Sequence, residues 1–150
     1  MRRSLVAASA ALLAVTVVGF AQADPFTYHS LTPISGQGSG SIAVSTTARN
    51  VSPNQFDVQI TVNIHGAVPN TEFTASRNVD FIADGICTNP TFAPFSPAFT
   101  TSAGGAGAAH YEVLRGPPLF AEGTEFDVSF RVVGTDGTVL TSECFTVTVK

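Results

Sequence analysis

The chain has 150 residues, a formal net charge of −4 and only 12% charged residues, with two cysteines and no tryptophan. Seven basic residues against eleven acidic ones exclude the broad basic surface that nucleic-acid binding requires. A hydrophobic fraction of 44% argues against a disordered acidic chain, and the length suits a single domain.

The first 23 residues have the pattern of a secretory signal peptide. Arg2 and Arg3 form a short basic region, residues 5–20 are almost wholly apolar, and Ala21-Gln22-Ala23 matches the cleavage pattern. This apolar run is shorter than the roughly 20 residues that a membrane span needs. We therefore expect cleavage after Ala23, secretion, and no membrane span in the mature chain.

Cys87 and Cys144 are the only two cysteines. An oxidising compartment favours a disulfide bond between them, and such a bond would stabilise the fold by about 4 kcal/mol in a chain-entropy treatment. The alternative is a pair of free thiols in a redox or metal-binding role, which the lack of a C-x-x-C spacing disfavours.

After residue 23 the hydrophobic residues alternate with a period of two, which indicates β-strands with one buried face. The strongest predicted strand covers residues 56–64, and residues 126–132 repeat its pattern. Weaker strands are predicted over residues 41–49, 72–82, 97–102, 107–114 and 138–149. Asp136-Gly137 should form a tight hairpin through a type I′ turn, because these residues can take positive φ angles.

This pattern predicts an all-β protein, a single antiparallel β-sandwich of about seven strands over residues 41–150. Residues 24–40 are expected to be a flexible lead-in, with residues 24–35 either a loose arm or an edge strand. The pattern contains two conflicts. Arg77 falls on an inward-facing position, so it either extends from an edge or follows a bulge. Cys144 falls opposite Phe145, which favours a surface disulfide tying the 83–96 loop across the sheet over a bulge near Ser142.

Short strands joined by hairpin turns resemble the immunoglobulin-like and fibronectin-type sandwiches, over about residues 41–149. The resemblance implies an extracellular binding module and transfers no functional residue. The chain departs from true immunoglobulin domains, because it has no tryptophan and its cysteines do not fall on the second and sixth strands. It is also similar in size and export to the neocarzinostatin-like chromophore carriers, but those carry two disulfides and this chain can form one.

The residues that could perform chemistry form no recognisable motif. His29, His65 and His110 lack the local spacing of zinc ligands. Residues 80–85 have the outline of a calcium loop, but Ile82 stands where an oxygen ligand is needed. No nucleophile elbow is present. We therefore predict no enzymatic activity, no cofactor and no metal site.

Residues 91–99 place three phenylalanines among prolines, close to Cys87. Proline lowers the entropy cost of binding and aromatic side chains anchor partners, which makes Phe92, Pro94, Phe95 and Pro97 a candidate partner-binding loop. The alternative is that these rings cap one end of a core that has no tryptophan.

The expected function is therefore that of a secreted, non-enzymatic binding or structural module. Its partner would be a protein or glycan outside the cell or in the cell envelope. Two alternatives stay open: a secreted carrier that holds a small apolar ligand between its sheets, and a protease inhibitor acting through the proline-rich loop.

Overall fold

The computed structural model describes residues 26–49, 55–95, 97–115 and 121–150, which form ten β-strands and no helix. The signal peptide predicted over residues 1–23 lies outside the described residues. The strands, in chain order, are β1 (Thr27–Ser35), β2 (Ser39–Arg49), β3 (Gln55–His65), β4 (Glu72–Asp80), β5 (Ala93–Pro94), β6 (Phe99–Thr100), β7 (Gly107–Arg115), β8 (Glu125–Gly134), β9 (Val139–Thr141) and β10 (Phe145–Thr148).

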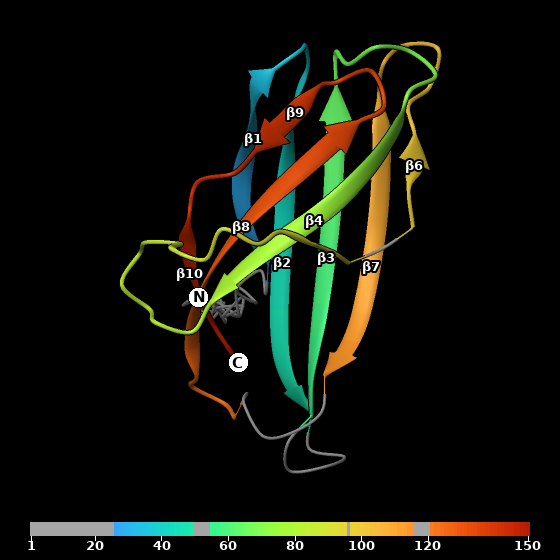
Figure 1. The fold of residues 1–150 in the computed structure, drawn as a ribbon. Helices are drawn as coiled ribbons and strands as arrows, with labels where there is room; N and C mark the ends of the chain where they lie inside the picture. The colour runs from blue at the N-terminus through green and yellow to red at the C-terminus, as the bar shows by residue number, and fades with distance from the viewer. Residues whose placement is uncertain (1–25, 50–54, 96, 116–120) are drawn as a thin grey trace, which may run out of the picture.

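All the strand pairings are antiparallel, and the strands form one curled sheet in the order β5-β4-β8-β9-β1-β2-β3-β7, with β10 also beside β8 and β6 beside β4. Strand β1 lies in the middle of this order and joins the two halves of the sheet, because residues 27–31 pair with β2 and residues 32–35 pair with β9. The first layer (β2, β3 and β7) therefore lies behind the second layer (β4, β8, β9 and β10), as Figure 1 shows.

The hydrophobic core lies between these two layers. Strand β3 turns Ile60, Val62 and Ile64 inward, each at most 2% exposed, while Asn63 and His65 face solvent. On β8 the inward side chains, all at most 6% exposed, are Phe126, Val128, Phe130 and Val132. The period of two in the sequence thus corresponds to the apolar face of each strand, which points into the core, and the all-β, antiparallel prediction is confirmed.

The described residues form three strands more than the seven predicted. Residues 24–40 were expected to be a flexible lead-in, with an edge strand over residues 24–35 as the alternative. Residues 27–35 do form a strand, β1, but it pairs with β2 and with β9 and is not an edge. Strand β5 is a short additional strand. The hydrophobic pattern does not reveal β1, because Leu31 is its one buried residue and no alternation of apolar and polar residues is visible. The glycines after it form the turn into β2, where Gly36 and Gly38 have φ angles of 73° and 110°.

The third additional strand arises because the last predicted strand is split into β9 and β10. Thr141 pairs with Arg131 and Phe145 pairs with Val128, so one strand has an extra residue and contains a bulge. The bulge turns Phe145 back toward the core. It lies between Ser142 and Phe145, because the backbone N–H of Ser142 still donates to the carbonyl oxygen of Phe130 over 2.9 Å, in the register of β9.

The hairpin at Asp136-Gly137 is present, but its turn is not of type I′. Gly137 has a φ of 87°, whereas Asn70 is the sole non-glycine residue with a positive φ in the described chain. The N–H of Gly137 donates to the carbonyl oxygen of Gly134 over 3.0 Å, which makes a type I turn followed by a left-handed glycine. Asp136 favours this turn because its carboxylate accepts hydrogen bonds from the N–H and hydroxyl of Thr138.

Candidate functional site: a cavity between the layers

A cavity of about 390 Å³ lies between the two layers of the sheet. Its first-layer wall is formed by residues of β2 and β3, namely Val44, Thr46, Val58 and Ile60. Its second-layer wall is formed by residues of β4 and β8 and the residue after β4, namely Arg77, Val79, Phe81, Phe126, Val128 and Phe130. Both the volume and the apolar lining are those of a site for a small organic molecule.

The long loop between β4 and β6 completes the wall. It contributes Asn89, Thr91, Ala93 and Phe95 to the lining, and β5 holds it against the free edge of β4 through pairing with Ser76 and Arg77. Phe81, Asn89 and Thr91 are exposed, so the cavity opens to solvent at this rim.

Arg77 is a charged residue in this otherwise uncharged lining. Strand β4 pairs with β8 without a register shift from Phe73 to Asp80, so the bulge considered from the sequence is absent. Arg77 therefore shares the inward face with Phe73 and Val79. It lies at the β5 edge, and its guanidinium carbon lies 5.9 Å from the ring centroid of Phe95.

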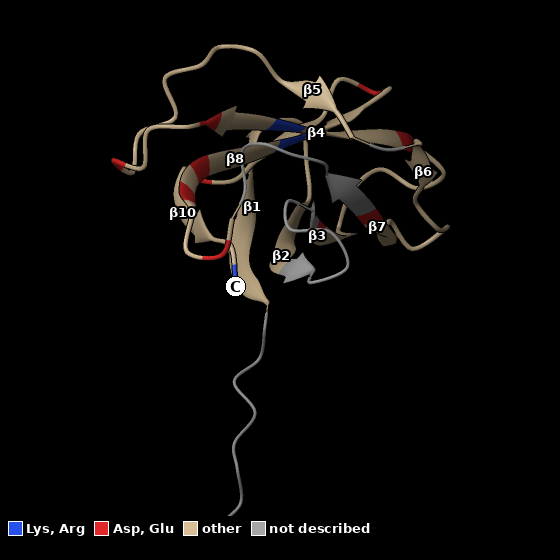
Figure 2. Ribbon diagram, turned by 90° about the horizontal axis from the view of Figure 1, so that it is seen from below, with Lys and Arg blue, Asp and Glu red and all other residues tan. Residues whose placement is uncertain are grey.

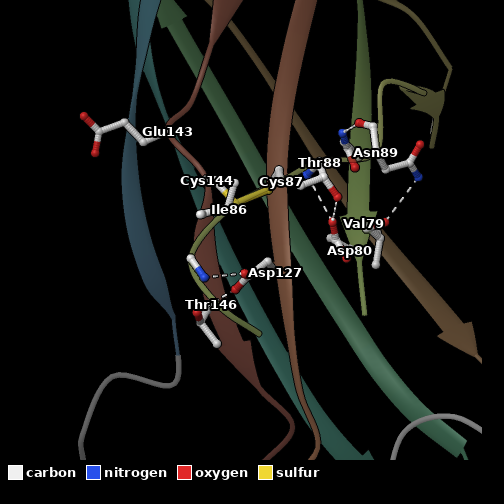
Figure 3. The surroundings of a disulfide bond; sticks show 12 residues. Val79, Asp80, Ile86, Cys87, Thr88, Asn89, Asp127, Glu143, Cys144 and Thr146 are labelled. Atoms are coloured by element: carbon white, nitrogen blue, oxygen red, sulfur yellow. Dashed lines mark hydrogen bonds between the residues drawn. A yellow bond between two sulfur atoms is a disulfide. The ribbon is translucent and has the colours of Figure 1, made fainter. Parts of the chain in front are cut away.

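The disulfide expected from the sequence joins Cys87 to Cys144, with a Cα–Cα distance of 5.6 Å. It lies on the outer face of the second layer, at the start of β10, and ties the loop after β4 across the sheet (Figure 3). The surface disulfide favoured from the sequence is thus confirmed. It coexists with a bulge between Ser142 and Phe145, and a bulge near Ser142 was the alternative explanation.

Two aspartates, Asp127 and Asp80, bind the loop that follows β4, and Asp127 holds it against the outer face. Asp127 of β8 accepts hydrogen bonds from the backbone N–H groups of Asp84 and Gly85, and from the hydroxyl of Thr146 at 2.6 Å (Figure 3). The Thr146 hydroxyl is the largest cause of the lowered pKa of Asp127; burial opposes it, and the loop N–H groups add to it. Asp127 is 0% exposed because the loop covers it.

Asp80, at the end of β4, closes the loop on itself. Its carboxylate accepts the hydroxyl and the N–H of Thr88 and the N–H of Ile82. The hydrogen bond from the Thr88 hydroxyl is the largest cause of the lowered pKa of Asp80, followed by those from the backbone. The residues that outlined a calcium loop therefore bind the backbone of their own loop.

The structure separates the residues of the candidate partner-binding loop. Phe95 points into the core, in edge-to-face contact with Tyr111 and Phe130 at centroid distances of 5.0 and 5.9 Å. Phe92 lies on the outer face, where the guanidinium carbon of Arg131 is 4.0 Å from its ring centroid. Pro94 and Pro97 are exposed. The four residues therefore do not form one surface. Phe95 packs against the core, as the alternative to a partner-binding loop expected.

The three histidines lie apart. His29 stacks on Phe145, His65 hydrogen-bonds to Ser39, and His110 hydrogen-bonds to Thr61. Burial lowers the pKa of His29, although the carboxylate of Glu143 opposes this effect. Within the described residues no three His, Cys, Asp or Glu side chains are grouped as metal ligands, and no helix is long and apolar enough to cross a membrane.

Comparison with known proteins adds no family to this description. No family model matches the chain, and a search of curated proteins finds no significant match.

Proposed function

We propose that this protein is a non-enzymatic carrier that holds a small apolar ligand in the cavity between its layers. The observation that carries the proposal is the cavity itself, about 390 Å³ in volume and lined mostly by Val, Ile and Phe side chains. Well-packed cores leave few voids larger than a water molecule, so an open apolar space of this size is typical of a binding site. This was an alternative to the partner-binding module expected from the sequence.

The proposal is tested with Nile red, a neutral apolar dye whose fluorescence rises on burial. We expect saturable binding to the mature protein. Val58→Phe, which fills the cavity from β3, should weaken binding about tenfold or more, because it replaces the space the dye needs. The matched control is Val133→Phe, on the exposed side of β8, which should bind as the wild type does. Equal binding by both variants, each with a native melting profile, would contradict the proposal.

A second candidate function is recognition of a protein partner by the start of the long loop. Phe81, Ile82 and Ile86 are 60%, 67% and 60% exposed, which is unusual for large apolar side chains so close together. A pull-down from the producing cell's envelope tests this function. A defined partner captured by the wild type and lost on the double change Ile82→Ser and Ile86→Ser would support it, and equal capture would contradict it.

Secretion forms part of the same proposal. It is supported by the signal-peptide pattern ending at Ala23 and by the disulfide, which an oxidising compartment maintains. We also propose that the fold is immunoglobulin-like, because all the pairings between the described strands are antiparallel. Mass spectrometry of the protein in culture fluid tests the export: a mature chain beginning at Asp24 is expected, and an intact precursor retained in cells would contradict it.

A further inference from the structure

We propose that a second, polar cleft of this protein binds a primary ammonium group, which pairs with the carboxylate of Glu143. The cleft has a volume of about 300 Å³ and is lined by Tyr28, His29, Ser30, Thr32 and Glu143. It shares no lining residue with the cavity between the layers, so this inference goes beyond the carrier function and does not depend on it.

The cleft lies where the sheet divides. Residues 27–31 of β1 pair with β2, and residues 32–35 pair with β9. Strand β10, which follows Glu143, pairs with β8 and not with β1. Among the described strands, none therefore pairs with residues 27–31 on the side away from β2. Alternate backbone groups of a strand point to each side, so this part of β1 directs N–H and C=O groups toward the cleft.

The bulge between β9 and β10 places Glu143 at the same point. Ser142 keeps the register of β9 and Phe145 begins β10, so Glu143 belongs to neither ladder. The hydroxyl of Ser142 donates to the carbonyl oxygen of Glu143 over 2.8 Å, which holds this segment. The side chain of Glu143 extends away from the disulfide and lines the cleft with residues of β1 (Figure 3). It is exposed, so its carboxylate carries a negative charge at neutral pH.

The charge of the lining selects the kind of ligand. Glu143 is the one acidic residue that lines the cleft, and no Lys or Arg of the described residues lines it. His29 does not cancel this charge. Burial lowers the pKa of its imidazole from the ordinary value of 6.5, although Glu143 opposes the effect, so the ring is neutral at pH 7. One negative charge among neutral polar groups favours a cation over an anion.

The surface around the cleft favours the same sign. In Figure 2 acidic positions occupy the part of β8 beside β10, whereas the basic positions of β4 and β8 lie together, close to β5. Lys150 follows β10 at the end opposite to Glu143. The whole chain has eleven acidic and seven basic residues. A cation that approaches this side is therefore attracted before it reaches the cleft.

A primary ammonium suits this lining better than a metal ion does. Its three N–H donors can be met by the carboxylate of Glu143, the hydroxyl of Ser30 and a backbone C=O of β1. A divalent metal ion needs more anionic or imidazole ligands, and no three His, Cys, Asp or Glu side chains are grouped in the part of the chain that the structure describes. The same ammonium chemistry occurs in free alkylamines and in the lysine side chain of a peptide.

The test is an NMR titration of the mature protein at pH 7 with three ligands that share one tail: butylammonium, butanol and butyrate. We expect butylammonium to bind with a Kd about fivefold lower than that of butanol, the size of one partly exposed ion pair, and butyrate to bind most weakly. Saturable shifts should fall on the backbone amides of residues 28–32 and 143. A capped Gly-Lys-Gly peptide distinguishes the sources, because only a peptide ligand should bind more tightly than butylammonium.

Two variants complete the test. Glu143→Gln removes the charge and keeps the shape, so it should reduce the affinity for butylammonium to that for butanol. Glu122→Gln removes an exposed carboxylate outside the cleft and should bind as the wild type does. Equal affinities for butylammonium and butanol in the wild type would overturn the proposal, and this comparison needs no variant. A preference for butylammonium that survives Glu143→Gln would also overturn it.

The carrier function is tested separately from this site. Nile red binding should be the same in Glu143→Gln and in the wild type, because Glu143 does not line the cavity. If Nile red does not bind, the carrier function falls and the ammonium site stands. If butylammonium shows no preference, the ammonium site falls and the carrier function stands.

Discussion

Cys87 is bonded to Cys144 on the outer face of the sheet, so a covalent bond on one side of β4 and β8 anchors the loop that lines the cavity on the other side. The loop leaves β4 at its end, crosses the outer face, and returns along the free edge of β4 through β5. The integrity of the cavity wall therefore depends on contacts made outside the cavity.

Replacing both cysteines by serine should lower the free energy of unfolding by about 4 kcal/mol, because the unfolded chain regains the entropy that the cross-link removes. It should also weaken Nile red binding, since the loop that carries Thr91 and Ala93 loses its anchor. Urea unfolding and dye titration measure the two effects, with the oxidised wild type as the control. Loss of stability with unchanged dye affinity would show that the loop does not need the bond to form the wall.

Stability should fall in acid because of Asp127 and Asp80. Their pKa values in the folded protein lie below the ordinary 3.8, so the stabilisation they provide is complete above that value. It is lost as the pH falls below 3.8 through the lower folded-state pKa values. Thermal melts between pH 7 and pH 2 should show this loss, and Asp127→Asn should reduce it. Glu122→Gln, at an exposed position before β8, is the control; an equal acid response in both variants would contradict the role of Asp127.

Gly40→Ala should destabilise the fold by about 1–3 kcal/mol, as overpacking does. A Cβ at Gly40 would overlap the backbone oxygen of Asn63 on β3, and backbone in the middle of a sheet cannot move aside cheaply. Gly104 is a matched control, because a Cβ there meets nothing nearer than 3.7 Å and its φ is not positive. Urea unfolding of Gly40→Ala and Gly104→Ala should therefore differ. Similar midpoints would contradict the close approach of β2 and β3.

The two phenylalanines of the proline-rich loop should respond differently to substitution. Phe95→Ser removes a ring from the core and should cost about 2 kcal/mol or more, because the site cannot collapse fully. Phe92→Ser removes a ring from the outer face and should cost less than about 1 kcal/mol, the range of an exposed cation–π contact. Thermal unfolding of both variants measures the difference. A larger loss for Phe92→Ser would show that this ring, rather than Phe95, supports the fold.

The sequence predicted the strands that bury one complete face, and it predicted the disulfide. Val62 and Val128 lie in runs where apolar and polar residues strictly alternate, a pattern that helices and loops do not show. Cys87 had one possible partner, because the chain has two cysteines. The sequence left residues 24–35 open between a loose arm and an edge strand, because Leu31 is the one buried residue of β1 and no alternation decides between the two. The split of the last strand depends on how Ser142 pairs with Phe130, a contact between distant segments.

The cavity could not be predicted from periodicity. Val58 and Val128 show the same inward alternation whether the layers touch or leave a space, because alternation reports the face of a residue and not the distance to the opposite layer. One signal was present in the sequence: Arg77 stood on an inward position, in conflict with its charge. Arg77 lines the cavity between the layers, which is open to solvent at its rim, so the conflict coincided with the position of the cavity.

The location of a bound ligand tests the central claim most directly. We would record methyl NMR spectra of the mature protein during titration with decanoate and follow the Val and Ile signals. The carrier proposal requires saturable shifts at the methyl groups that line the cavity, including those of Val58, Ile60 and Val128. Shifts confined to the exposed methyl groups of Ile34 and Ile86, with the cavity methyl groups unchanged, would contradict it.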